Sequence, residues 1–161
     1  MNARSDTPVG TQALILSKLY YGVLSKSLEN LDIERYFSVL YFVNRHNGCS
    51  QQFICNHLSI DKTAMVKVIN YLVKAGYISR TRNPEDRREY FISLTKKGEK
   101  RSEEISSAFS SIDAEMFAGM PREKKEQFLD MLTLLSDRLR ALPSEDLFFN
   151  YKKTKPRTGK K

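Results

Sequence analysis

Residues 61–98 decide the fold, and they read DKTAMVKVINYLVKAGYISRTRNPEDRREYFISLTKKG. The stretch opens with Asp61, a good helix N-cap, and its first apolar positions recur at the spacing of one helix face: Met65, Val68, Ile69 and Leu72. Gly76 supplies the residue that most often follows a helix end. These signals predict a helix over residues 61–75.

A β-hairpin is expected directly after that helix. Residues 77–82 and 89–94 are separated by the turn-forming segment 83–86, which contains Pro84. In the second run, Tyr90, Ile92 and Leu94 alternate with Phe91 and Ser93, as in a strand with one buried face. The two runs therefore predict a two-stranded hairpin.

Helices are predicted on both sides of this segment. Upstream, residues 12–29 have helical periodicity, Asp32 caps a helix to about Arg45, and Ser50 caps a short helix over 51–58. Two helices joined by a tight turn and followed by a hairpin make a winged helix-turn-helix, in which the second helix is the natural reader of the DNA major groove.

Two further helices are predicted downstream of the hairpin. Thr95 caps a long helix to about Ala118, and Pro121 occupies the first position of a last helix that reaches about Ala141, before Pro143. The fold class is mainly α with a small β-hairpin wing.

Positive charge is concentrated in two blocks. The 161 residues carry a formal net charge of +8. Residues 61–101 contribute +6 and residues 151–161 another +6, whereas residues 102–150 contribute −5 and residues 1–60 only +1. Charge separated in this way favours a polyanionic partner at the 61–101 segment more strongly than a uniform excess would.

Double-stranded DNA is the expected partner, because the predicted reader helix carries groove-compatible side chains on its outer face. Lys reaches phosphate or guanine, Thr reaches phosphate or a base edge, Ala and Val touch a thymine methyl group, and Asn pairs with adenine. The candidate DNA contacts on and before this helix are Ser50, Gln51, Lys62, Thr63, Ala64, Val66, Lys67 and Asn70.

The hairpin supplies the second group of candidates. A charged outer face on a helix taken alone is more often simply solvated than bound to a partner. Here arginines surround the hairpin tip, where they would reach an adjacent minor groove, in which arginine is favoured: Arg80, Arg82, Arg87 and Arg88.

The chain resembles the MarR (multiple antibiotic resistance regulator) family. The resemblance is carried by the 61–78 segment and by Asn83–Arg88 followed by Leu94-Thr95 and Lys97-Gly98, and it is close over about residues 31–101. The pattern D-x-R, five residues, then L-T is matched without a gap. The departures are Lys67, where arginine is usual in the family, and the long basic tail.

The resemblance implies a domain organisation and a function. Residues 1–30 and 102–143 would be dimerisation helices, and residues 31–101 the winged-helix domain. Residues 144–161 are a basic tail outside the resemblance, and its last eleven residues are too polar to fold alone. The resemblance implies a homodimeric transcriptional regulator on a palindromic operator, with recognition helix 61–75 and wing 78–94. The resemblance implies that Arg88 enters the minor groove and that Asp86 holds it there by an ion pair. It also suggests a small-molecule pocket between the dimer helices and the DNA-binding lobes. The aromatic candidates for lining that pocket are Tyr20, Tyr36, Phe37 and Tyr41.

The last predicted helix supports dimerisation independently of the resemblance. Its apolar positions form a band wider than one partner helix covers: Phe128, Leu129, Met131, Leu132, Leu134, Leu135 and Leu139. Burial within one subunit remains the alternative interpretation.

Other classes of chemistry find little support. The seven glycines never fall two apart, so no Gly-rich dinucleotide or Walker loop exists, and we expect no enzyme and no cofactor. His46, Cys49, Cys55 and His57 cluster in sequence, but their spacing fits no usual zinc pattern, so no metal is expected. Cys55 is assigned to the core, and Cys49, in a loop, is the more exposed thiol.

The expected location is the cytoplasm, at the nucleoid. No signal peptide precedes the first helix, and its apolar stretch is interrupted by Ser17 and Lys18, so no membrane span is predicted. Two alternatives to a ligand-responsive repressor stay open: a redox- or metal-sensing regulator on the same fold, or a winged-helix scaffold that binds protein or RNA.

Overall fold

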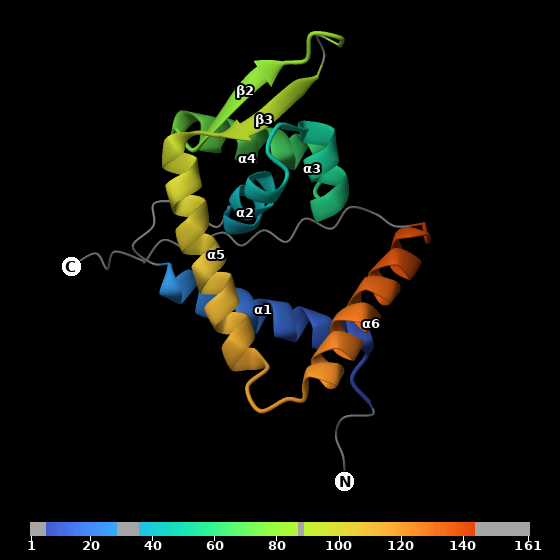
Figure 1. The fold of residues 1–161 in the computed structure, drawn as a ribbon. Coiled ribbons are helices and arrows are strands. Elements are labelled where there is room, and N and C mark those ends of the chain that lie inside the picture. The colour runs from blue at the N-terminus through green and yellow to red at the C-terminus, as the bar shows by residue number, and fades with distance from the viewer. Residues whose placement is uncertain (1–5, 29–35, 87–88, 144–161) are drawn as a thin grey trace, which may run out of the picture.

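The computed structural model describes residues 6–28, 36–86 and 89–143. Two helices of a helix-turn-helix and a small sheet form one lobe, while long helices form a second part (Figure 1). The elements are α1 (Val9–Ser27), α2 (Phe37–Arg45), β1 (Cys49–Ser50), α3 (Gln51–Leu58), α4 (Lys62–Lys74), β2 (Ile78–Arg82), β3 (Tyr90–Leu94), α5 (Lys96–Met116) and α6 (Arg122–Arg140). This confirms the mainly α fold class with a hairpin wing.

The predicted helix starts are confirmed where side chains cap them. The Ser50 hydroxyl accepts a hydrogen bond from the Phe53 amide at the start of α3, and an Asp61 carboxylate oxygen accepts one from the Ala64 amide at the start of α4. Thr95 does the same for α5 through the Gly98 amide. Each cap satisfies an amide that a helix start leaves without a partner, so the boundaries are set locally.

Two predicted helix starts need comment. Helix α6 begins at Arg122, so Pro121 occupies the N-cap rather than the first helical position. The ring fixes φ at −55° in either place, which is why the sequence signal does not distinguish the two positions. The predicted cap Asp32 lies outside the described residues, and α2 is described from Phe37.

The sheet has three antiparallel strands in the order β1-β3-β2, so the hairpin gains a strand that the sequence analysis missed. Strand β1 pairs Cys49 with Ile92 and Ser50 with Phe91. Two residues are too few to show a period of two, and pairing with a distant strand leaves no local signal. Cys49 therefore lies in a strand and not in a loop.

One hydrophobic core holds the lobe to the long helices. Its fully buried members include Leu40 of α2, Ile69 of α4 and Ile92 of β3, together with Leu24 of α1 and Ile105 of α5. Because α1 and α5 contribute to the same core as the helix-turn-helix, the lobe is not an independent domain joined to them by a linker.

The start of α5 is fastened to the end of α4. The Thr95 hydroxyl donates to the Gly76 carbonyl at 2.6 Å, the Thr95 amide donates to the Tyr77 carbonyl at 3.0 Å, and the Lys97 ammonium donates to the Ala75 carbonyl at 2.8 Å. The Lys97 nitrogen also lies 4.2 Å from the centre of the Tyr77 ring. These contacts join the reader helix to the long helix through a rigid corner.

The long helices spread away from the lobe. Figure 1 shows α1 crossing α5, with α6 turning back from the end of α5. None of the 19 residues of α6, all of which the structure describes, is buried. None of the helices in the described part of the chain is long and apolar enough to cross a membrane.

Candidate nucleic-acid interface

The outer face of α4 is exposed as the sequence predicts. Met65, Ile69 and Leu72 are fully buried, whereas the exposed residues on the other side of the helix are Lys62, Thr63, Val66, Lys67 and Asn70. Val66 is 37% exposed, which leaves an apolar contact surface between the two lysines. The face therefore combines cationic, amide, hydroxyl and methyl groups on one rigid helix.

Ala64 does not belong to the exposed part of this face, and its role as a DNA contact stays a prediction. Only 8% of its surface is exposed. The reason is helical geometry, because Ala64 stands four residues before Val68 and eight before Leu72, and all three lie on the buried side. The spacing from Ala64 to Val68 is visible in the sequence and would have assigned it to the core.

The start of α3 contributes less than the start of α4. Ser50 and Gln51 are both half-buried, and the Ser50 oxygen already accepts the capping bond from Phe53. The Ser50 hydroxyl still has a proton to donate, so a phosphate contact remains compatible with the cap.

The wing strand β2 lies against α4 and places its arginines beside the reader helix. Arg80 donates a hydrogen bond from Nη2 to Asn70 Oδ1, which joins the wing to the exposed face of α4. Arg82 donates from Nε to the Tyr90 hydroxyl at 3.4 Å, and the Arg80 guanidinium lies 5.9 Å from the centre of the Tyr90 ring. The structure thus brings Asn70, Arg80 and Arg82 together.

Tyr90 is a positioning residue that the sequence analysis did not single out. It pairs directly with Arg82 across the hairpin, and Arg80 pairs with Ile92, so these side chains share one face of the sheet. Counting the register of the hairpin outward from its turn would have found this relationship.

The wing tip is described up to Asp86. The Asn83 side-chain oxygen accepts from the Glu85 amide at 2.9 Å, and the Glu89 amide donates to the Asp86 carbonyl at 2.9 Å, so polar groups of the hairpin connection bond to one another. Arg87 and Arg88 lie outside the described residues. The bracing of Arg88 by Asp86 stays a prediction.

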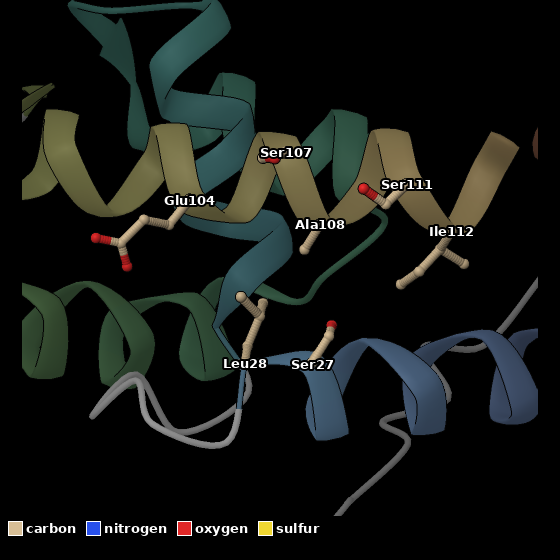
Figure 2. A pocket seen from close by; sticks show the side chains of 7 residues that line it. All are labelled: Ser27, Leu28, Glu104, Ser107, Ala108, Ser111 and Ile112. Carbon is tan, nitrogen blue, oxygen red and sulfur yellow. The ribbon is translucent and has the colours of Figure 1, made fainter. Parts of the chain in front are cut away.

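A pocket of about 500 Å³ lies between the end of α1 and the middle of α5 (Figure 2). Ser27 and Leu28 line it from α1 and the residue after it. On the other side, α5 contributes Glu104, Ser107, Ala108, Ser111 and Ile112. Its lining combines serine hydroxyls and one carboxylate with three apolar side chains.

A second pocket, of about 330 Å³, lies between α1, α5 and α6, and Tyr20 lines it. The Tyr20 hydroxyl donates to an Asp113 carboxylate oxygen at 2.7 Å, and burial followed by this bond raises the pKa of Tyr20 well above its usual range. The hydroxyl therefore stays protonated and serves as a fixed link from α1 to α5.

The other three aromatic candidates line neither of these two pockets. Phe37 is 5% exposed and belongs to the core. The Tyr36 ring packs on Tyr71 at 5.1 Å, and the Tyr41 ring packs on Phe109 at 5.0 Å. These aromatic rings pack against other elements of the fold, and a ligand-binding role for them stays a prediction.

The histidines and cysteines form no metal centre in the described part of the chain, where no group of three or more potential ligands is found. The rings of His46 and His57 pack on Phe53 at 5.4 and 4.1 Å. Cys55 is buried as predicted, and burial raises the pKa of both the Cys49 and the Cys55 thiol.

Comparison with known proteins places these features in a family. A sequence model of the MarR family matches residues 31–89. The chain is 31% identical over 100 residues to the HTH-type transcriptional regulator BilQ of Clostridium symbiosum, an alignment that covers 60% of this chain and 69% of that protein.

Solved structures share the fold. The structure of a putative MarR family regulator from Listeria monocytogenes in complex with a 26mer DNA matches with a TM-score of 0.78 at 17% identity, over 83% of this chain and 89% of that one. The regulator PcaV from Streptomyces coelicolor, in complex with its natural ligand, matches with a TM-score of 0.71 at 19% identity, over 83% and 94%.

Proposed function

This chain belongs to the MarR family of transcriptional regulators, and from that premise we propose that it is a homodimeric, ligand-responsive repressor of a palindromic operator. Its DNA-binding fold and its relatives, which are transcriptional regulators, confirm that it is a regulator and not an enzyme. DNA as the partner would place it in the cytoplasm, at the nucleoid.

The observation that carries the proposal is the exposed face formed by α4 and β2. Lys62, Lys67 and Arg80 lie on elements packed against each other, so their charges converge on one surface. An α-helix fits the B-DNA major groove, and a wing beside it meets the neighbouring backbone or minor groove. Basic charge, groove-sized shape and polar readers therefore coincide at one place.

Gel-shift titrations test the DNA partner. Duplexes selected from a random pool are compared with single strands and RNA, and we expect a clear preference for a palindromic duplex. Lys67→Ala and Arg88→Ala should each weaken duplex binding by about tenfold. Lys100→Ala, which removes an exposed lysine of α5, is the matched control and should bind like the wild type. Equal binding of duplex, single strand and RNA would instead favour a scaffold function.

A second copy of the chain is the proposed cover of the exposed apolar face on α1 and α6. Large hydrophobic side chains are exposed along both helices, among them Leu19 (63%), Val23 (56%) and Leu139 (65%). Contiguous apolar surface of this kind marks an interaction site. A dimer would also set two α4 helices about 34 Å apart, one turn of DNA.

Sedimentation analysis tests the dimer. The double variant Leu135→Glu/Leu139→Glu should sediment as a monomer, because it buries two carboxylates in the proposed interface. Thr133→Glu, which places the same charge on the polar side of α6, should remain dimeric. A wild-type monomer at micromolar concentration would contradict the dimer.

The pocket between α1 and α5 is the proposed effector site. Its volume falls in the range of small-molecule sites, and it lies between the end of α1 and the middle of α5 (Figure 2). A compound with an apolar body and polar groups for Ser27, Ser107 and Ser111 would fit it. PcaV, a relative in fold, was solved with its natural ligand.

A thermal-shift screen of a small-molecule library tests the effector site. Compounds that stabilise the wild type should not stabilise Ala108→Phe, in which the new ring fills the pocket. Ser110→Phe places the same ring on an exposed position of α5 outside the pocket lining and should respond like the wild type. Compounds that stabilise both variants equally would place the effector elsewhere.

A further inference from the structure

The hydrogen bond between Arg80 and Asn70 fixes how the amide of Asn70 is oriented. A guanidinium has only N–H donors and no acceptor, so the amide atom that faces Arg80 must be the oxygen. The usual ambiguity between the oxygen and nitrogen of an asparagine is therefore resolved by chemistry at this position.

This bond uses one of the two lone pairs on the oxygen with which an asparagine reads adenine, and it places the cationic donors of Arg80 beside that oxygen. Adenine is recognised by a bidentate contact in which the amide nitrogen donates to N7 and the amide oxygen accepts from the N6 amino group. In this structure Oδ1 is turned towards Arg80, and the free part of the amide is Nδ2 with its two protons. An acceptor placed against Oδ1 also meets the guanidinium, so the Asn70–Arg80 pair favours a base edge that carries acceptors.

Arg80 adds further donors beside that amide. Only one nitrogen of its guanidinium, Nη2, donates to Asn70. A guanidinium carries five N–H donors and no acceptor, so further donors remain beside the amide. Both residues are exposed, so DNA can reach them. The pair therefore presents a surface of donors, which matches the two major-groove acceptors of guanine, N7 and O6.

The pair is held by rigid parts of the fold. The backbone of Arg80 pairs with Ile92, a fully buried residue at the middle of β3, and its guanidinium lies over the Tyr90 ring. Asn70 follows directly after Ile69, which is also fully buried on α4. Both side chains start from fixed backbone, so their orientation is set before DNA arrives.

We propose that Arg80 sets the base preference of Asn70, so that the two side chains together select guanine over adenine at one position of each half-site. This inference rests on the proposed function, because it requires that α4 enter the major groove. It revises the expectation that Asn70 pairs with adenine, because that expectation takes the Asn70 amide without Arg80 beside it.

Selection of duplexes from a random pool, followed by sequencing, tests the proposal. The wild type should enrich guanine at one position of each half-site, and Arg80→Ala should lower the guanine-to-adenine ratio at that position by about tenfold. Without the guanidinium, both lone pairs of Asn70 Oδ1 are available, and adenine N6 can donate to this oxygen with no cationic donor beside it. Arg82→Ala, which removes a neighbouring wing arginine bonded to Tyr90 and not to α4, is the matched control and should keep the guanine.

A second variant separates specificity from simple loss of affinity. Asn70→Asp keeps an acceptor for Arg80 but has no proton to donate, so the preference for guanine should fall while the ion pair preserves the wing. The selections are run at reduced salt, where phosphate contacts compensate for weaker base contacts.

Three results would overturn the inference. The first is an adenine preference in the wild type at the position affected by Asn70→Asp. The second is an unchanged base profile in both Arg80→Ala and Asn70→Asp. The third is loss of all duplex binding in Arg80→Ala at every salt concentration while Arg82→Ala still binds. By contrast, a wild-type protein that selects no duplex sequence would refute the proposed function itself.

Discussion

Gly98 approaches Tyr77 so closely that a β-carbon at position 98 would collide with the Tyr77 carbonyl oxygen. Gly98 lies in the first turn of α5, and Tyr77 follows the end of α4. The same carbonyl accepts a hydrogen bond from the Thr95 amide, so it cannot turn away without breaking that bond. The corner between the reader helix and the long helix thus depends on the missing side chain at position 98.

Gly98→Ala should therefore destabilise the protein severely. The new β-carbon meets a backbone atom and not a flexible side chain, so α5 must move away from the corner, at a cost of about 3 kcal/mol or more in the free energy of unfolding. Urea denaturation measures the loss. Gly22→Ala is the control, because nothing lies within 4 Å of its added carbon, and it should be neutral or slightly stabilising. Equal stability of the two variants would refute the close packing.

Ser102→Ala should stabilise the protein. The Ser102 side chain is fully buried on α5, and its hydroxyl has no hydrogen-bond partner among the described residues. Removing the oxygen ends the cost of burying an unpaired polar group, so the free energy of unfolding should rise by up to about 1 kcal/mol. Thermal or urea denaturation checks the sign. A clear loss of stability would mean that the hydroxyl has a partner after all.

The Cys49 thiol should react slowly at neutral pH. Partial burial in β1 raises its pKa, so less thiolate is present at a given pH than for an ordinary thiol. In a Cys55→Ser background, alkylation by iodoacetamide should rise with pH along a curve displaced to higher pH than that of a free cysteine peptide. A displacement to lower pH would revive the redox-sensing alternative.

Peroxide should correspondingly leave DNA binding intact. Oxidation requires an exposed thiolate, and neither Cys49 nor Cys55 is exposed. A gel shift before and after peroxide treatment measures this directly. If peroxide releases the duplex, and Cys49→Ser abolishes the release, the redox alternative replaces the ligand-responsive one.

Deletion of residues 152–161 should reduce the salt dependence of DNA binding and leave the sequence preference unchanged. The eleven residues from 151 onward carry six basic and no acidic side chains. Each phosphate that the tail neutralises adds about 0.9 to the steepness of log affinity against log salt, so the deletion should flatten that slope. Titrations at several salt concentrations measure the slope. An altered base profile in a random-pool selection would contradict a purely electrostatic role.

The features predicted from sequence are those whose cause is local. Asp61, Thr95 and Gly76 each act within a few residues, so the bounds of α4 and α5 and the turn after α4 follow from the chain itself. Gly76 indeed has a φ of +75°, the left-handed conformation that glycine adopts freely. The outer face of α4 follows from periodicity in the same way. Ala64 is the exception, because it lies four residues before Val68 and shares its buried side.

The features that sequence reasoning missed arise between distant segments. The pairing of Cys49 with Ile92 and the bond from Arg80 to Asn70 each join two elements, and their residue types alone do not reveal them. The same holds for Phe37, which is buried in a core that several elements share. Tertiary contacts of this kind decide which exposed candidates are free to act and which are already engaged.

Helix α5 connects the corner at the end of α4 to the turn before α6. It spans 21 residues, which at 1.5 Å each gives about 32 Å from the fastened corner at α4 to the turn before α6. Tilting a rod of that length by about 5° displaces its far end by about 3 Å, close to the rise of one base pair. A small change in how the long helices pack would therefore move α4 along the DNA by about the rise of one base pair.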